Sequence, residues 1–150
     1  MRLAKPAHLS ILLSGLLSFS ALSQTLEVNL SGFRSDQGQL VVNVYTSKKN
    51  WLSEKPADIF QQNIYPLSGA LNDESLQFTL ELPEGEYALY AFQDKDNDGE
   101  LKSNWIGIPK EPVATSNNAK GSMGPPKYND AKFTVAGEKS QQNMQLANMD

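Results

Sequence analysis

Apolar and polar residues alternate along three stretches of the chain, which is the period of a β-strand that buries one face. The apolar positions of these stretches are Leu26, Val28 and Leu30, then Leu40, Val42 and Val44, then Leu76, Phe78, Leu80 and Leu82. A shift of one residue would turn every apolar side chain of such a strand to solvent, so we expect each set to face a core. In the third stretch this places Leu80 and Leu82 inward, and Thr79 and Glu81 outward.

The segment 86–93 is different, because it is apolar at almost every position. Such a run predicts a central strand that is buried on both faces. The two faces carry Tyr87, Leu89 and Ala91, and Ala88, Tyr90 and Phe92, respectively. Directly before the run, Leu82-Pro83-Glu84-Gly85 offers Pro for the first turn dihedral and Gly for a positive φ, which predicts a hairpin.

Weaker patterns complete the expected fold. Residues 131–135 and 141–146 are further short strands, and 51–62 holds one helical turn with Ser53 as N-cap and Pro56 near its start. Six or seven short strands without a long helix predict an all-β fold, an antiparallel β-sandwich of the immunoglobulin or prealbumin kind.

The predicted connection from about 94 to 130 has almost no strand pattern. It is longer than the ~15 residues beyond which an irregular loop in a compact domain needs an explanation. Loops of this kind often carry function, and an ion bound at its start would help to order it.

The run Asp94-Lys95-Asp96-Asn97-Asp98-Gly99 at the start of this loop resembles part of a calcium loop. Asp94, Asp96 and Asp98 fill side-chain positions one, three and five, Gly99 permits the turn, and Glu100 offers its carbonyl. Position twelve, which is a glutamate in an EF-hand, is occupied by a tryptophan here. The sequence predicts weak Ca²⁺ binding, and its alternative is a solvated acidic turn.

Glu111 is the candidate for the missing carboxylate, because a loop that doubles back would bring it to the ion. Its alternative is a surface ion pair with Lys110 or another cation. The predicted metal ligands are therefore Asp94, Asp96, Asp98, the Glu100 carbonyl and Glu111.

The N-terminus has the order of a secretory signal peptide. Arg2 and Lys5 precede an apolar stretch over 9–22, and Ala21-Leu22-Ser23 has the small residues of a cleavage site. We expect residues 1–23 to be removed, leaving one domain over 24–150 that is exported to the periplasm or medium and is not inserted in a membrane.

Composition narrows the chemistry of this exported domain. Residues 1–23 contain two of the 13 basic residues and none of the 17 acidic ones, so the remaining chain has a net charge of −6. That charge disfavours nucleic acid and anionic membranes as partners. The single histidine is His8 and there is no cysteine, which removes the commonest general base, thiolate nucleophiles and the usual zinc ligands.

Several motifs together make the chain similar to a known family. In order they are Leu82-Pro83-Glu84-Gly85, Tyr87-Ala88-Leu89, the acidic run with Leu101, Asn104, Gly107-Ile108-Pro109-Lys110-Glu111, Ser116-Asn117-Asn118-Ala119 and Gly124-Pro125-Pro126. They resemble domain of unknown function 2141, a bacterial family of small exported proteins, over essentially the whole mature chain. The resemblance implies no established activity. Members often have Asp where this chain has Lys102, and that departure weakens a closed shell of ligands here.

Two other groups of residues have a structural and a functional interpretation. Ser116-Asn117-Asn118 would bond a polar ligand or, as we favour, its own backbone. Trp105 and Tyr128, with Trp51 and Tyr65 further off, would form an aromatic platform for a ligand or cover one end of the fold.

We therefore favour an exported, non-catalytic binding or structural module with a calcium-stabilised loop and an unidentified extracytoplasmic ligand or protein partner. The alternative is a small hydrolase that uses paired carboxylates, such as Asp94 or Asp98 with Glu111.

Overall fold

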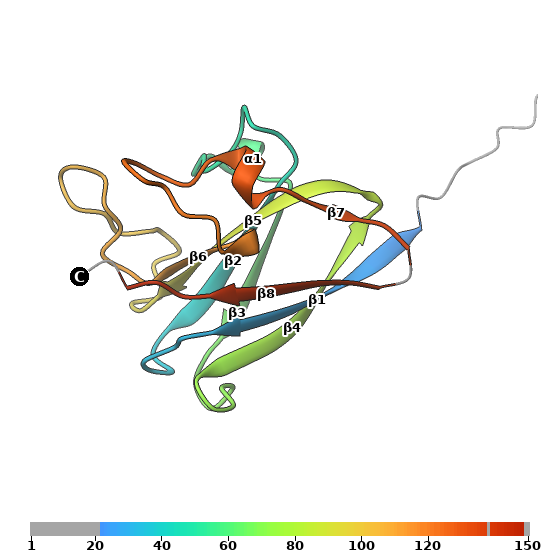
Figure 1. Cartoon of the computed structure of the whole chain (residues 1–150). Coiled ribbons are helices and arrows are strands. Elements are labelled where there is room, and N and C mark those ends of the chain that lie inside the picture. Colours follow the sequence, from blue (N-terminus) through green and yellow to red (C-terminus); the bar gives the residue numbers. More distant parts are fainter. Residues whose placement is uncertain (1–21, 138, 149–150) are drawn as a thin grey trace, which may run out of the picture.

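The computed structural model describes residues 22–137 and 139–148, and within them the chain is almost entirely β-structure (Figure 1). The predicted signal segment lies outside the described residues, apart from Leu22 and Ser23. The elements are β1 (Ser23–Ser31), β2 (Gln39–Tyr45), the 3₁₀ turn η1 (Pro56–Asp58), β3 (Gln61–Pro66), β4 (Ser75–Pro83), β5 (Gly85–Asp94), β6 (Val113–Thr115), the 3₁₀ turn η2 (Ser116–Asn118), α1 (Tyr128–Ala131), β7 (Phe133–Val135) and β8 (Lys139–Gln145).

The strands form two sheets. The three-stranded sheet has the order β4-β1-β8, and the five-stranded sheet has the order β3-β2-β5-β6, with β7 pairing the start of β5. Every pair is antiparallel except β1 and β8, which run parallel. The prediction of a purely antiparallel fold is wrong for this pair. After β7 the chain crosses to the three-stranded sheet, where β8 lies beside β1 and runs in the same direction as β1. No local sequence pattern reveals this crossing.

The two sheets pack face to face over one core. The core-facing positions predicted from alternation are confirmed, because Leu80, Leu82, Leu89 and Ala91 are all buried in this core. The predicted hairpin is wrong: a tight turn at residues 83–85 joins β4 to β5, but β4 pairs with β1 in one sheet and β5 pairs with β2 in the other, so this turn links the two sheets. Thr79 and Glu81 are exposed, as period two requires.

The outer face of the five-stranded sheet is also apolar. Val41, Tyr45, Tyr90, Phe92 and Val113 form a second cluster there, against which side chains of the covering loops pack. Strand β5 is thus buried on both faces, as the sequence predicts. Trp51, Leu52, Ile59 and Leu101 of the segments 46–60 and 95–127 pack against this face. Further residues of both segments line the space over it.

The long connection after Asp94 is less irregular than predicted, since β6, η2 and α1 lie within it or at its end. Strand β6 begins directly after Pro112 and has only three residues. A strand of this length is too short to show a periodic pattern in the sequence. Its pairing with Tyr90, Ala91 and Phe92 of β5 fixes it in place.

Two further expectations need correction around residues 51–66. The predicted helical turn exists as η1 with Pro56 at its start, but its N-cap is Lys55 and not Ser53. The Ser53 hydroxyl instead donates to Asp58 Oδ2 at 2.6 Å. Strand β3 was not predicted, because Gln61, Gln62 and Asn63 are poor strand formers that an edge position tolerates.

Candidate functional site

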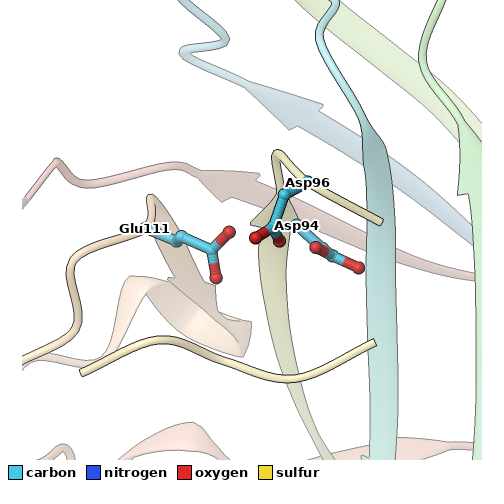
Figure 2. Close-up of side chains that lie close together, drawn as sticks. All are labelled: Asp94, Asp96 and Glu111. Atoms are coloured by element: carbon cyan, nitrogen blue, oxygen red, sulfur yellow. The ribbon is translucent and has the colours of Figure 1, made fainter. Parts of the chain in front are cut away.

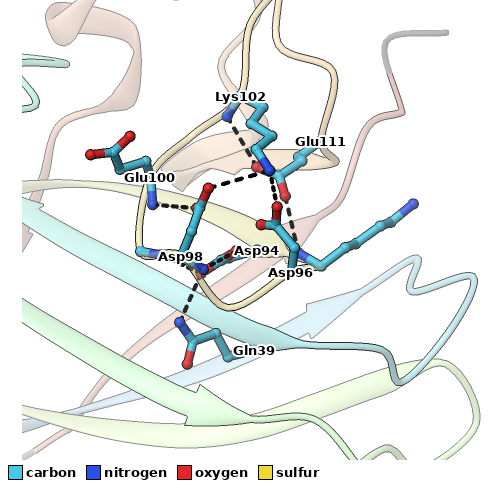
Figure 3. Close-up of polar contacts among 9 residues, drawn as sticks. Gln39, Asp94, Asp96, Asp98, Glu100, Lys102 and Glu111 are labelled. Carbon is cyan, nitrogen blue, oxygen red and sulfur yellow. Dashed lines mark hydrogen bonds and ion pairs between the residues drawn. The ribbon is translucent and has the colours of Figure 1, made fainter.

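The acidic run folds around the side chain of Asp94, which is the last residue of β5 and is fully buried. Its Oδ2 accepts hydrogen bonds from Gln39 Nε2 at 2.7 Å and from the Gly99 amide at 2.8 Å, and its Oδ1 accepts one from the Asp98 amide at 3.3 Å (Figure 3). A carboxylate that accepts three hydrogen bonds holds the loop in a tight turn. Gly38 makes room for this turn, because a Cβ there would lie 2.1 Å from the Asp94 carbonyl oxygen.

Glu111 returns to the same loop, as the sequence predicts. Its Oε1 accepts a hydrogen bond from the Lys95 amide at 3.0 Å, and its Oε2 accepts one from the Lys102 amide at 3.1 Å. The residue is only 6% exposed, so the alternative of a surface ion pair is wrong. The Glu111 carboxylate ties the beginning and the end of the acidic loop together.

Three of the five predicted metal ligands gather in space. Each of Asp94, Asp96 and Glu111 has a carboxylate oxygen within 4.8 Å of one from the other two (Figure 2). Asp98 does not join this group, and its Oδ1 accepts a hydrogen bond from the Glu100 amide at 2.9 Å. Glu100 is exposed at the outer side of the loop.

Lys102 supplies a cation from within the chain. Its ammonium contacts Asp96 Oδ2 and lies 3.3 Å from Asp98 Oδ2 (Figure 3). All three side chains are about half exposed, so water screens these contacts and each contributes little to stability. The ammonium nevertheless lies beside two carboxylates that the sequence assigns to calcium.

The segment 102–110 beyond the acidic loop is a small hairpin with a well-defined tip. The Lys110 amide donates to the Lys102 carbonyl at 2.7 Å at its base. At the tip, Asn104 Oδ1 accepts hydrogen bonds from the amides of Ile106 and Ile108, at 3.0 and 2.9 Å. Trp105 stands at this tip with 94% of its surface exposed. The sequence analysis named Asn104 only as part of a motif and missed its role in this turn, although Asn side chains often fold such turns.

A groove of about 1310 Å³ lies over the outer face of the five-stranded sheet. Its lining includes Asn43, Tyr45, Tyr90, Phe92 and Thr115 from the strands. Its other lining residues come from the loops, chiefly 99–109 and 118–126, together with residues of 52–59. The hairpin held by Glu111 therefore forms one wall of the groove.

The strand residues of the groove are uncharged and include buried polar atoms. Asn43 Oδ1 accepts a hydrogen bond from Gln62 Nε2 at 2.9 Å, and the Tyr45 hydroxyl donates to the Ser53 carbonyl at 3.0 Å. Burial raises the pKa of Tyr90 far above its ordinary value near 10, and raises that of Tyr45 as well. Both phenols are neutral at physiological pH, so these strands offer hydrogen bonds and apolar contact rather than charge.

The Ser116-Asn117-Asn118 motif has a structural role, as we favoured, but its side chains bond the backbone of other segments and not their own. Ser116 Oγ donates to the Ala131 carbonyl at 2.6 Å and accepts from the Leu89 amide at 2.9 Å. Asn118 bonds the outer edge of β8, where its Nδ2 donates to the Asn143 carbonyl and its Oδ1 accepts from the Gln145 amide.

The proposed aromatic platform does not form as one surface. Trp51 and Tyr128 pack edge to face with ring centroids 5.9 Å apart, and Trp51 Nε1 donates to the Pro126 carbonyl at 2.8 Å. These rings cover the sheet, whereas Trp105 projects into solvent. Tyr65 packs on Phe78, away from this group.

Comparison with known proteins gives one match. The family model described as an uncharacterized protein conserved in bacteria (DUF2141) matches residues 28–143. No curated protein and no solved structure matches significantly. Within residues 22–137 and 139–148, no helix has the length and apolar character needed to cross a membrane.

Proposed function

The chain belongs to the DUF2141 family, and we propose that it is an exported, non-catalytic module that binds an uncharged amphipathic molecule in its groove. The observation that carries this proposal is the groove of about 1310 Å³ on the outer sheet face, lined by Tyr90 and Phe92 and walled by ordered loops. Small-molecule sites are usually concave, largely apolar and supplied with a few polar groups.

The lining favours a neutral ligand. Its charged residues are Glu54, Glu100 and Lys120, and no arginine is among them. Because the lining has two carboxylates and only one ammonium group, an anionic ligand would find few positive charges to pair with. The apolar lining residues would contact the body of the ligand, and Asn43, Gln62 and Thr115 would bond its polar groups.

The alternative of a carboxylate hydrolase has less support. Paired-carboxylate hydrolysis needs one carboxyl group free to give a proton and another free to attack or to activate water. Asp94 is fully buried and accepts three hydrogen bonds, while both oxygens of Glu111 accept backbone amides. These carboxylates are engaged in holding the loop.

Calcium binding remains part of the proposal as a weak interaction, with Kd of order 10⁻⁴–10⁻³ M. Asp94, Asp96 and Glu111 are close enough to share an ion, but Lys102 competes for Asp96. A melting temperature that is higher in about 10 mM calcium than in chelator supports this part. An equal melting temperature in calcium and in chelator would contradict calcium binding and would mean that only the Lys102 ammonium neutralises the acidic loop.

Export and the finer fold type belong to the same proposal. We infer that residues 1–23 are removed and that the two packed sheets are an immunoglobulin- or prealbumin-like sandwich. The intact mass of the protein recovered from periplasm or medium tests the processing, and a mass that includes Met1 to Ser23 would contradict it.

Nile red, a neutral dye that fluoresces in apolar surroundings, tests the groove itself. The domain should bind it, and should bind anionic anilinonaphthalene sulfonate more weakly. Ile108→Glu places a charge on the groove wall and should weaken Nile red binding at least about tenfold, a change of roughly 1.4 kcal/mol.

Ile64→Glu is the matched control, because Ile64 is similarly exposed on β3 but does not line the groove. Absence of dye binding by the unmodified domain, or equal loss in both variants, would refute the groove as the site.

A further inference from the structure

Two loops carry most of the exposed large apolar side chains of the described residues. Four of the seven such side chains lie within 102–127, namely Trp105, Ile106, Ile108 and Met123. Met123 is fully exposed and Trp105 is 94% exposed. Both loops border the same groove and project from the same end of the molecule (Figure 1).

The same two loops are basic, although the chain as a whole is acidic. Residues 101–127 contain four lysines and one acidic residue, Glu111, whose carboxylate is buried. Lys102 pairs with the acidic loop. Lys110, Lys120 and Lys127 are exposed, and no carboxylate of the described residues forms an ion pair with them.

The tip that carries Trp105 is already ordered. Asn104 bonds the amides of Ile106 and Ile108, and the Gly107 amide donates to the Asn104 carbonyl at 3.0 Å. An exposed indole on an ordered turn loses little further conformational entropy when it is buried by a partner. Nothing inside the described fold uses Trp105, so its exposure points to a partner.

We propose that these two loops dock the protein on an anionic phospholipid surface. Tryptophan prefers the headgroup layer of a membrane, and lysines beside it are attracted to anionic lipids. Two separate tips flanked by lysines suit a soft headgroup layer better than a rigid protein pocket. Of the acidic residues next to these loops, Asp96 and Asp98 pair with Lys102, and Glu100 is exposed beside the groove and opposes part of the attraction. Charges farther away than the Debye length, about 8 Å at physiological ionic strength, act weakly at this surface. This attachment needs no spanning segment.

Co-sedimentation with vesicles tests the proposal. The protein is residues 22–150, which contain every described element and lack most of the apolar N-terminal stretch that would itself enter a bilayer. One set of vesicles is phosphatidylcholine alone, and the other contains about 30% phosphatidylglycerol. We expect binding to the anionic vesicles, a weaker interaction with the neutral ones, and loss of binding at high salt.

Trp105→Ser with Met123→Ser should lower the partition coefficient at least about tenfold, since both side chains would bury apolar area. Ile64→Ser removes an apolar side chain that is 49% exposed on β3, outside these loops, and should not change the partition coefficient. Lys120→Gln should lower it about fivefold, as one lysine near an anionic surface contributes about 1 kcal/mol. Lys139→Gln is the control, because Lys139 lies on β8, outside these loops, and pairs with Glu27, and it should have no effect.

Brominated lipids provide a direct readout of depth. They should quench Trp105 in the bound protein, and this quenching should vanish in Trp105→Ser, where only the packed Trp51 remains. Absence of vesicle binding, or binding that the Trp105 and Met123 substitutions leave unchanged, would overturn the proposal.

Discussion

Replacing Glu111 by Gln tests whether one buried carboxylate holds the loop that walls the groove. The carboxylate accepts the amides of Lys95 and Lys102 at 3.0 and 3.1 Å. Hydrogen bonds to a charged group contribute roughly 1.5–3 kcal/mol each. Gln retains one acceptor oxygen and turns an NH₂ group toward the other amide, which is itself a donor.

The expected cost of Glu111→Gln is therefore about 2–4 kcal/mol, from one weakened bond and one partly buried amide that loses its acceptor. Because the affected contacts join loop residues and not strands, much of this cost should appear as local opening. Hydrogen exchange at the Lys95 and Lys102 amides should become about 30- to 1000-fold faster, whereas exchange in β2 and β5 changes less.

Glu100→Gln is the control, since Glu100 is an exposed acidic residue of the same loop and its side chain is removed from this contact. Exchange is measured by mass spectrometry or NMR in chelator, so that metal does not contribute. If Glu111→Gln speeds exchange of the two amides by less than about threefold, the carboxylate does not hold the loop and the magnitude reasoned here is wrong.

Three further predictions follow from the same structure. Lys102→Gln should raise calcium affinity about tenfold, because repulsion between the Lys102 ammonium and a calcium ion about 5 Å away costs roughly 1–2 kcal/mol even in water. Equal affinities of the two proteins in titration calorimetry would contradict this. Leu80→Ala should lower the free energy of unfolding by about 2–5 kcal/mol in chemical denaturation, whereas the control Thr79→Ala, at an outward-facing position, should leave it nearly unchanged. A loss of only a few tenths of a kcal/mol for Leu80→Ala would mean that the inward face is misassigned. Burial raises the pKa of Tyr45 and Tyr90, so the folded state retains protons that the unfolded state loses above pH 10. Stability should be unaffected by these groups below about pH 10 and fall above it, and denaturation midpoints that stay constant from pH 9 to 11.5 would exclude the effect.

The strands and their inward faces could be predicted because period-two alternation is a local property. Leu80, Leu82, Leu89 and Ala91 lie in the core as the pattern requires. The return of Glu111 to the acidic loop was also predictable, since the calcium pattern lacks one carboxylate and the next suitable residue is Glu111.

Other features depend on long-range contacts that no local pattern carries. The parallel pairing of β1 with β8 depends on the path after β7, and the groove depends on how two loops fold back over β5. Lys102 was noted as a missing ligand, but its contact with Asp96 follows only from the shape of the loop. Strand β3 was missed because its sequence is polar, and its place beside β2 overrides the weak propensity.

Asn118 has a consequence for how the molecule meets its own copies. An outer strand normally presents free backbone groups to which another chain can add. On β8 the Asn118 side chain occupies the Asn143 carbonyl and the Gln145 amide, so it takes the place that a neighbouring strand would fill. One amide side chain thus blocks the addition of another strand at this end of β8, the outer strand of the three-stranded sheet.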